Sequence, residues 1–226
     1  MDDKARVPLG ITAANVQAPI LMHLDYRVQL PYHDFVVAEK HKLIPSVYAG
    51  ILIKKDGEGS PEAVTYSEPT YVAIRSGKHS SSNAETHATD VHKLTELPTF
   101  ENMIRTGECF VKPVFIFTCD GEPDENPRYE WVIVSALQHF KDFHLDAIYI
   151  ATNAPGRSAF NRVERRMSPL SRELTGVLLK HDAFGSHLDS INRTTDLDLE
   201  KRNFESAGNV LAEIWSKLAI DNFPVV

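Results

Sequence analysis

The sequence predicts an α/β fold, a mixed sheet flanked by helices. Apolar residues alternate with polar ones in the N-terminal third, whereas the second half contains two continuous apolar runs separated by a stretch with helical spacing. Alternation is typical of antiparallel strands with one exposed face, and continuous runs are typical of parallel strands buried on both faces. Because helices and strands alternate in the second half, we expect parallel crossovers there and a single domain spanning residues 1–226.

The N-terminal third is predicted to form antiparallel strands. Residues 5–11 alternate loosely, and residues 20–30 alternate strictly until a proline ends the run. Residues 47–53 and 70–74 are further strand candidates. The glycine and proline clusters within residues 54–69 indicate a loop between them.

Helices and buried strands are predicted to alternate along the rest of the chain. A polar stretch with helical spacing, residues 80–94, begins at three serines (Ser80, Ser81 and Ser82), any of which is a suitable N-cap. Helix signals then alternate with apolar runs, and Ser168-Pro169 predicts that one helix ends and another begins there. The expected helices are 98–105, 128–143, 158–167, one from Ser168 and 197–218, and the expected buried strands are 111–118 and 146–152.

The composition excludes several classes of protein. No apolar stretch is long enough to span a bilayer and the first residues are charged, so we expect a protein that is neither exported nor membrane-bound and resides in the nucleus or cytoplasm. Two cysteines are too few for a disulfide scaffold. A net charge of −7 disfavours nonspecific nucleic-acid binding, yet residues 157–172 carry five arginines and form a local basic segment.

The strongest local signal for chemistry is Asp120, which directly follows a predicted buried strand. Ligands of α/β proteins bind at the carboxyl edge of the sheet, where this side chain is expected. Glu164 lies on a helix that begins after the next buried strand, so the two carboxylates could share a divalent cation. A turn or capping role for Asp120 explains the pattern equally well and is the more common case.

Two sequence blocks resemble those of DDE transposases of the mariner-related and insertion-sequence kind. Residues 119–128 (CDGEPDENPR) are similar to the block around the second catalytic Asp, and residues 153–166 (NAPGRSAFNRVERR) are similar to a Pro-Gly-x-Ser-x-x-Asn-x-x-Glu block that carries the catalytic Glu. The start of the chain, Asp2-Asp3-Lys4, resembles the block of the first catalytic Asp. The resemblance implies a ribonuclease H-like fold whose five-stranded mixed sheet has three antiparallel strands followed by parallel ones.

The resemblance also implies the chemistry. Asp2, Asp120 and Glu164 would be the catalytic, metal-binding carboxylates, holding two Mg²⁺ or Mn²⁺ ions about 3.5 to 4 Å apart for cleavage and strand transfer of DNA ends. Asn161 is expected one helical turn before Glu164, where it would orient the substrate or serve only as a polar residue of the helix start. The basic residues of this block would grip DNA phosphates, or else lie on a solvated helix face. The residues expected to contact DNA are Arg157, Asn161, Arg162, Arg165 and Arg166.

Two departures from the family pattern leave an alternative open. Gly121-Glu122 stands where such families usually have Gly-Gly, and the chain starts one residue before Asp2, where these families have a longer lead into the first strand. The second hypothesis is therefore a truncated, transposon-derived protein that lacks catalysis and acts as a binding domain or has no function. A third is a nuclease that cleaves RNA or DNA without strand transfer. The partner is expected to be DNA, and self-association into a homo-oligomer is left open.

The histidines do not predict a zinc site from their spacing. His79, His87 and His92 fall on or near one predicted helix, but they match no H-E-x-x-H or paired Cys/His signature. We therefore do not expect a zinc site at these positions.

Overall fold

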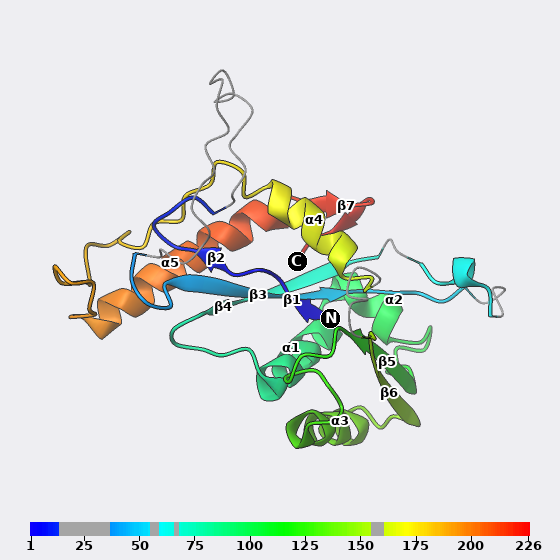
Figure 1. Ribbon diagram of the computed structural model, residues 1–226. Helices are drawn as coiled ribbons and strands as arrows, with labels where there is room; N and C mark the ends of the chain where they lie inside the picture. Colours follow the sequence, from blue (N-terminus) through cyan, green and yellow to red (C-terminus); the bar gives the residue numbers. More distant parts are fainter. Residues whose placement is uncertain (14–36, 55–58, 66–67, 155–160) are drawn as a thin grey trace.

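The structure is a computed structural model that describes residues 1–13, 37–54, 59–65, 68–154 and 161–226 (Figure 1). Within these ranges the chain is a mixed α/β protein with five α-helices and with both antiparallel and parallel strand pairs. The predicted strand over residues 20–30 lies outside the described residues. So do residues 158–160, the first residues of the predicted helix 158–167. None of the described helices is long and apolar enough to cross a membrane.

A four-stranded antiparallel sheet forms the centre of the molecule. Its middle strand, β3, pairs with β4 along one edge and with the short strands β1 and β2 along the other. Asp2 lies opposite Val47 and Val7 lies opposite Leu43, so the register shifts by one residue between the two short strands. Such a shift is the mark of a β-bulge, which makes β1 and β2 two halves of one interrupted strand. The strands are β1 (Asp2–Asp3), β2 (Val7–Pro8), β3 (Lys42–Ala49) and β4 (Thr70–Ser76).

A parallel pair of strands lies next to the start of β1. Strands β5 (Val114–Cys119) and β6 (Ala147–Thr152) pair in parallel and are connected through helix α3 (Glu130–Asp142), as the sequence predicted within a few residues. The N-terminal ammonium of Met1 donates a hydrogen bond to the carbonyl oxygen of Thr118 at 2.6 Å. This bond brings the beginning of β1 beside the end of β5.

Helix α1 (Ala84–Glu96) begins at Asn83 and not at the predicted serines. The Asn83 side chain accepts a hydrogen bond from the backbone N–H of Thr86, and the Thr86 hydroxyl accepts one from the backbone N–H of Asn83. This reciprocal capping box satisfies two donors that would otherwise lack partners at the helix start. The predicted cap at Ser80 to Ser82 is therefore wrong by one residue or more.

Helix α4 (Glu164–Arg172) continues through Pro169, so the predicted restart at Ser168-Pro169 is wrong. Proline has no backbone N–H, so Pro169 removes one hydrogen bond of the helix. The helix ends at Arg172, soon after this residue.

Helix α5 (Leu197–Ser216) is capped by Asp196, whose side chain accepts from the backbone N–H of Leu199 at 2.9 Å. The remaining short elements are η2 (Pro61–Ala63), η3 (Pro98–Phe100), α2 (Glu101–Ile104), β7 (Ala219–Ile220) and β8 (Phe223–Pro224).

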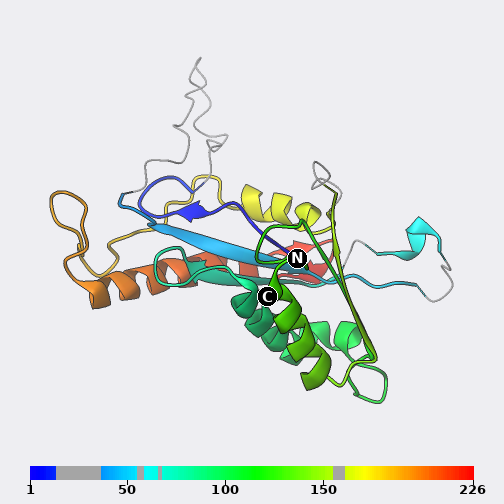
Figure 2. The same ribbon diagram turned by 60° about the horizontal axis from the view of Figure 1, so that its bottom comes forward.

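The helices cover both faces of the central sheet (Figures 1 and 2). On one face α4 and α5 pack over β3 through a core that includes Val47, Leu170 and Trp215. On the other face α1 packs against Tyr48 with Val91 and Leu94, and α3 lies against α1. Successive strand residues point to opposite faces, so Asp2 and Asp3, the two residues of β1, lie on different faces of the sheet.

Candidate metal centre

Three carboxylates meet where β1 begins and β5 ends, one from the first residues of the chain and two from the stretch after β5. Asp2 is on β1, Asp120 follows β5 directly, and Glu125 lies in the loop after it. One ligand oxygen from each of the three lies within 4.8 Å of the others. Asp2 is only 7% exposed and Glu125 only 2% exposed, whereas Asp120 is half-buried. The group therefore has one open side, at Asp120.

Asp120 also makes the turn that the sequence left open as its alternative role. Its Oδ1 accepts a hydrogen bond from the backbone N–H of Glu122 at 3.1 Å. Gly121 has a φ of 101°, a conformation that favours glycine, and it reverses the chain directly after the strand. The turn fixes the Asp120 side chain at the sheet edge, so the two roles coexist.

Glu125 was not singled out by the sequence reasoning. Both of its carboxylate oxygens are buried without a hydrogen-bond partner among the described residues. Its backbone N–H donates to the carbonyl oxygen of Glu122 at 3.0 Å, which closes a turn and directs the side chain inward. Buried carboxyl groups normally have a partner, so this one requires an explanation such as a bound cation. Glu122 and Asp124 are also acidic, and nothing in the sequence marks which acid of this loop faces inward.

Burial and mutual repulsion shift the pKa values of these acids upward. Desolvation, followed by the negative charges of Asp120 and Glu164, raises the pKa of Asp2 to about 7. Desolvation raises the pKa of Glu125 to about 9, against the lowering effect of the N-terminal ammonium. Carboxylates this close favour a bound cation, because it removes the repulsion between them.

Glu164 stands next to this group but does not belong to its closest set. It is the first residue of α4, half-buried, and its charge acts on both Asp2 and Lys4. Lys4 is buried and donates from Nζ to Ser171 Oγ at 2.7 Å. Desolvation lowers the pKa of Lys4 and the negative charge of Glu164 opposes that shift. The structure thus brings Asp2 and Asp120 together and places Glu164 within electrostatic reach of them.

The residues expected to contact DNA have different positions. Arg165 is exposed on α4, and Arg157 lies outside the described residues. Arg162 is half-buried and donates to the carbonyl oxygens of Val64 and Thr65 at 3.2 and 3.1 Å.

Arg166 is 1% exposed, with Asp221 at 3.8 Å. Desolvation lowers its pKa and the negative charges of Asp221 and Glu68 oppose that shift. A side chain buried in this way does not fit the predicted place on a DNA-facing surface. The neighbouring Arg165 is exposed and fits that place.

Asn161 is also not where the sequence predicted it. It precedes α4 and is buried. Its backbone carbonyl oxygen accepts a hydrogen bond from the backbone N–H of Glu164 at 3.2 Å. Neither polar atom of its side chain has a hydrogen-bond partner among the described residues. Because it lies before the helix, it does not share a helical face with Glu164, and burial separates it from solvent.

A second acidic group lies on the opposite face of β1. Asp3 approaches His87 and Asp124, with ligand atoms of the three within 4.8 Å of one another. Asp3 Oδ1 accepts a hydrogen bond from the hydroxyl of Ser46, its partner across the sheet. Of the two neighbours Asp2 and Asp3, it is therefore Asp2 whose carboxylate lies beside that of Asp120.

A buried hydrogen-bond chain supports this second group. The hydroxyl of Tyr48 donates to Asp90 at 2.8 Å and accepts from His87 Nδ1 at 2.6 Å. His87 Nε2 then faces Asp124 at 3.3 Å. Asp90 also pairs with Arg75. His87 thereby ties α1 to the loop that carries Asp120 and Glu125.

Comparison with protein-family models, with curated proteins and with solved structures gave no match.

Proposed function

We propose that this protein is a metal-dependent DNA-processing domain that resembles the catalytic core of DDE transposases and cleaves and joins the phosphodiester bonds of DNA ends. The observation that carries the proposal is the convergence of Asp2 and Asp120 from strands that are distant in sequence. The influence of Glu164 on the pKa of Asp2 adds the third predicted carboxylate to the same region. Asp2, Asp120 and Glu164 are the three catalytic residues that the resemblance of the sequence blocks implies.

The strand arrangement supports a ribonuclease H-like sheet. The antiparallel strands β4, β3 and β1 are followed in space by β5, because Met1 bonds to Thr118, and then by the parallel strand β6. Strands β5 and β6 form a two-stranded sheet of their own, and the order β4, β3, β1, β5 and β6 would match the expected five-stranded mixed sheet if the contact between Met1 and Thr118 continued as a strand pair. Strand β1 begins at the site and strand β5 ends there, so Asp2 and Asp120 lie at the same edge.

The donor set suits Mg²⁺ or Mn²⁺. All of the converging groups are carboxylates, and hard divalent cations prefer oxygen ligands. Asp2, Asp120 and Glu125 would hold the ion, with Glu164 at its side, and the partnerless oxygens of Glu125 fit this role. Such an ion stabilises the charge that develops on phosphate oxygens during the displacement.

DNA is the proposed substrate, and Arg165 is the described residue best placed to contact it. It follows Glu164 directly and is exposed, so its guanidinium can reach a phosphate beside the carboxylates. Lys4 and Arg166 instead stay inside the fold, where they balance the charges of Glu164 and Asp221. The binding surface is therefore expected to be local, in keeping with the net charge of −7.

Nicking of supercoiled plasmid in the presence of Mn²⁺ tests the proposal. We expect activity from the unaltered protein and a loss of at least about a hundredfold in Asp120→Asn, because one oxygen ligand is lost. Asp146→Asn is the matched control, since this exposed Asp precedes β6 away from the site.

Equal nicking by Asp120→Asn and the unaltered protein would contradict the proposal. Binding of Mn²⁺ without nicking would favour the alternative, a transposon-derived protein that has kept its metal site and lost its catalysis. The position of Glu164 outside the closest carboxylate set is the observation that keeps this alternative in view.

A further inference from the structure

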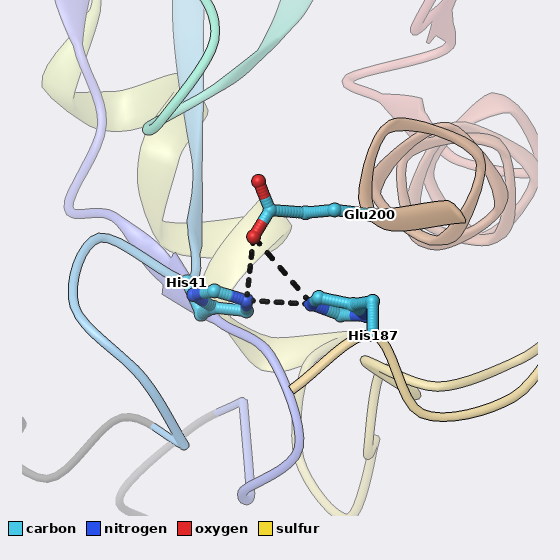
Figure 3. Close-up of side chains that lie close together, drawn as sticks. All are labelled: His41, His187 and Glu200. Atoms are coloured by element: carbon cyan, nitrogen blue, oxygen red, sulfur yellow. Dashed lines mark hydrogen bonds and ion pairs between the residues drawn. The ribbon is translucent and has the colours of Figure 1, made fainter. Parts of the chain in front are cut away.

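Two buried histidines and a buried glutamate meet at the opposite end of the central sheet from the carboxylate centre. His41 directly precedes β3, His187 lies in the segment between α4 and α5, and Glu200 is in the first turn of α5 (Figure 3). All three side chains are 0% exposed. His41 is far in sequence from the other two, so chain proximity does not explain its place in the cluster.

The three side chains present one ligand atom each to a common point. The Nε2 atoms of His41 and His187 are 2.8 Å apart, and Glu200 Oε2 lies 3.6 Å from the first and 3.7 Å from the second. The point equidistant from these atoms is about 2.0 Å from each, the bond length of zinc to imidazole nitrogen and carboxylate oxygen. Two imidazoles and one carboxylate form a donor set that zinc uses in proteins, with a water as the fourth ligand.

Neighbouring groups hold the ligands as they are held in zinc sites. His41 Nδ1 bonds to the backbone carbonyl oxygen of Glu39 at 3.1 Å, which leaves the lone pair on Nε2. The Glu200 carboxylate accepts hydrogen bonds from Lys78 at 2.7 Å, from His79 at 2.8 Å and from the hydroxyl of Thr194. His79 thereby brings a further imidazole to this carboxylate.

The cluster lies beside a long segment that has no regular secondary structure. Residues 173–196 contain no helix and no strand apart from isolated bridges, although loops longer than about 12 to 15 residues are uncommon without a functional reason. His187 is the point at which this segment meets the start of β3 and the start of α5. Phe204 closes the site with its ring 5.1 Å from that of His41 and 5.0 Å from that of His79.

A hydrogen bond between the two imidazoles is the competing account. Their rings are within 3° of coplanar with centroids 5.1 Å apart, so a proton between the Nε2 atoms fits the geometry. Tetrahedral zinc sets its ligand atoms about 3.3 Å apart, which requires these nitrogens to separate by about 0.5 Å. Zinc would replace the shared proton. It would also place the remaining proton of His187 on Nδ1, which now faces the Asn203 Nδ2 at 2.9 Å.

We propose that His41, His187 and Glu200 form a zinc site that fastens the 173–196 segment to the sheet and to α5. The site is separate from the carboxylate centre and would operate whether or not the protein cleaves DNA. The histidine spacing in the sequence gave no sign of it, because the residues that meet are not the neighbours His79, His87 and His92.

Metal analysis of the untagged protein tests the site. After dialysis against a mild chelator we expect about one zinc ion per chain by mass spectrometry, and a tetrahedral Co²⁺ absorption spectrum after exchange. His41→Gln and His187→Gln should each lower zinc affinity by at least about tenfold in competition with a chromophoric chelator. His92→Gln, outside the cluster, and Asp120→Asn, in the carboxylate centre, should keep wild-type zinc affinity.

A gain-of-affinity variant covers the case in which the histidine variants do not fold. Asn203 Oδ1 accepts from the backbone N–H of Phe184 at 2.9 Å, and its Nδ2 faces His187. Asn203→Asp keeps the first contact and offers an acceptor to the Nδ1 proton of a zinc-bound His187, although it loses the Nδ2 hydrogen bond to the carbonyl oxygen of Gly185 at 3.0 Å, so we expect tighter zinc binding than in the unaltered protein. Absence of zinc and of a Co²⁺ spectrum, equal affinity in the histidine variants, or unchanged or weaker binding in Asn203→Asp would each overturn the proposal.

Discussion

At the scale of single residues, position relative to a strand was a better guide than residue type. Asp120 could be predicted because it follows a continuous apolar run, and the structure places it at the sheet edge beside Asp2. Glu125 could not, because burial in a loop depends on the turn that Glu122 and Gly121 create and not on any periodicity. The prediction that Arg166 lies on a DNA-facing surface was wrong. A run of basic residues suggests an exposed surface, but the packing of α4 buries this side chain.

Glu125→Gln should separate metal binding from packing. The amide has nearly the shape of the carboxyl group, so we expect the unfolding free energy without metal to change by less than about 1 kcal/mol. Added Mn²⁺ should stabilise the unaltered protein, by about 3 kcal/mol at a hundredfold excess over Kd, and should stabilise the variant much less. Urea denaturation with and without Mn²⁺ measures both quantities. Equal stabilisation of the two proteins would remove Glu125 from the site.

His139 makes stability depend on pH. It is buried on α3, and desolvation, with a smaller effect from the charge of His92, lowers its pKa to about 4. Between pH about 6.5 and 4 the unfolded chain binds a proton at this position and the folded chain does not, so stability is complete above pH 6.5 and falls as the pH drops towards 4. The full loss is about 3 kcal/mol.

Replacing His139 with leucine should remove this component. Urea denaturation at pH 7.5 and at pH 4.5 gives the comparison, and the loss between the two conditions should be smaller in His139→Leu than in the unaltered protein. Equal losses would show that His139 is not the group responsible. The similar volume of leucine keeps the packing against Phe143, whose ring stacks on that of His139.

At the scale of elements, the order of helices and strands was predictable and their ends were not. The apolar runs located β5 and β6 because parallel strands are buried on both faces. By contrast, α1 begins at Asn83 after three serines that fit the cap pattern equally well, and only the side-chain geometry selects among them. Pro169 lies inside α4 because loss of one hydrogen bond near a helix end is tolerated.

The capping box of α1 provides a test at this scale. Asn83→Ala removes the acceptor for the Thr86 backbone N–H and should lower the unfolding free energy by about 1 kcal/mol. Ser80→Ala is the control, because the Ser80 hydroxyl donates only to the exposed carbonyl of Ser76 and should matter by less than about 0.5 kcal/mol. Chemical denaturation distinguishes the two. The reverse ranking would place the cap at the serines after all.

At the scale of the whole molecule, contacts between distant segments decide the function and are the least visible in a sequence. The antiparallel first part and the parallel second part were predictable from periodicity, and the structure has both. The bond from Met1 to Thr118 that joins them has no local signature. The same holds for His41, His187 and Glu200, whose meeting depends on the packing of α5 against the sheet.

The proposed carboxylate centre makes one requirement of the whole fold, that β1, β5 and the loop after it bring their acids to a single ion. Calorimetric titration with Mn²⁺ measures this directly. We predict binding to the unaltered protein and to Asp146→Asn, and at least about a hundredfold weaker binding to Asp120→Asn. Binding to Asp120→Asn that equals binding to the unaltered protein would contradict the account, because the ion would then be held somewhere else.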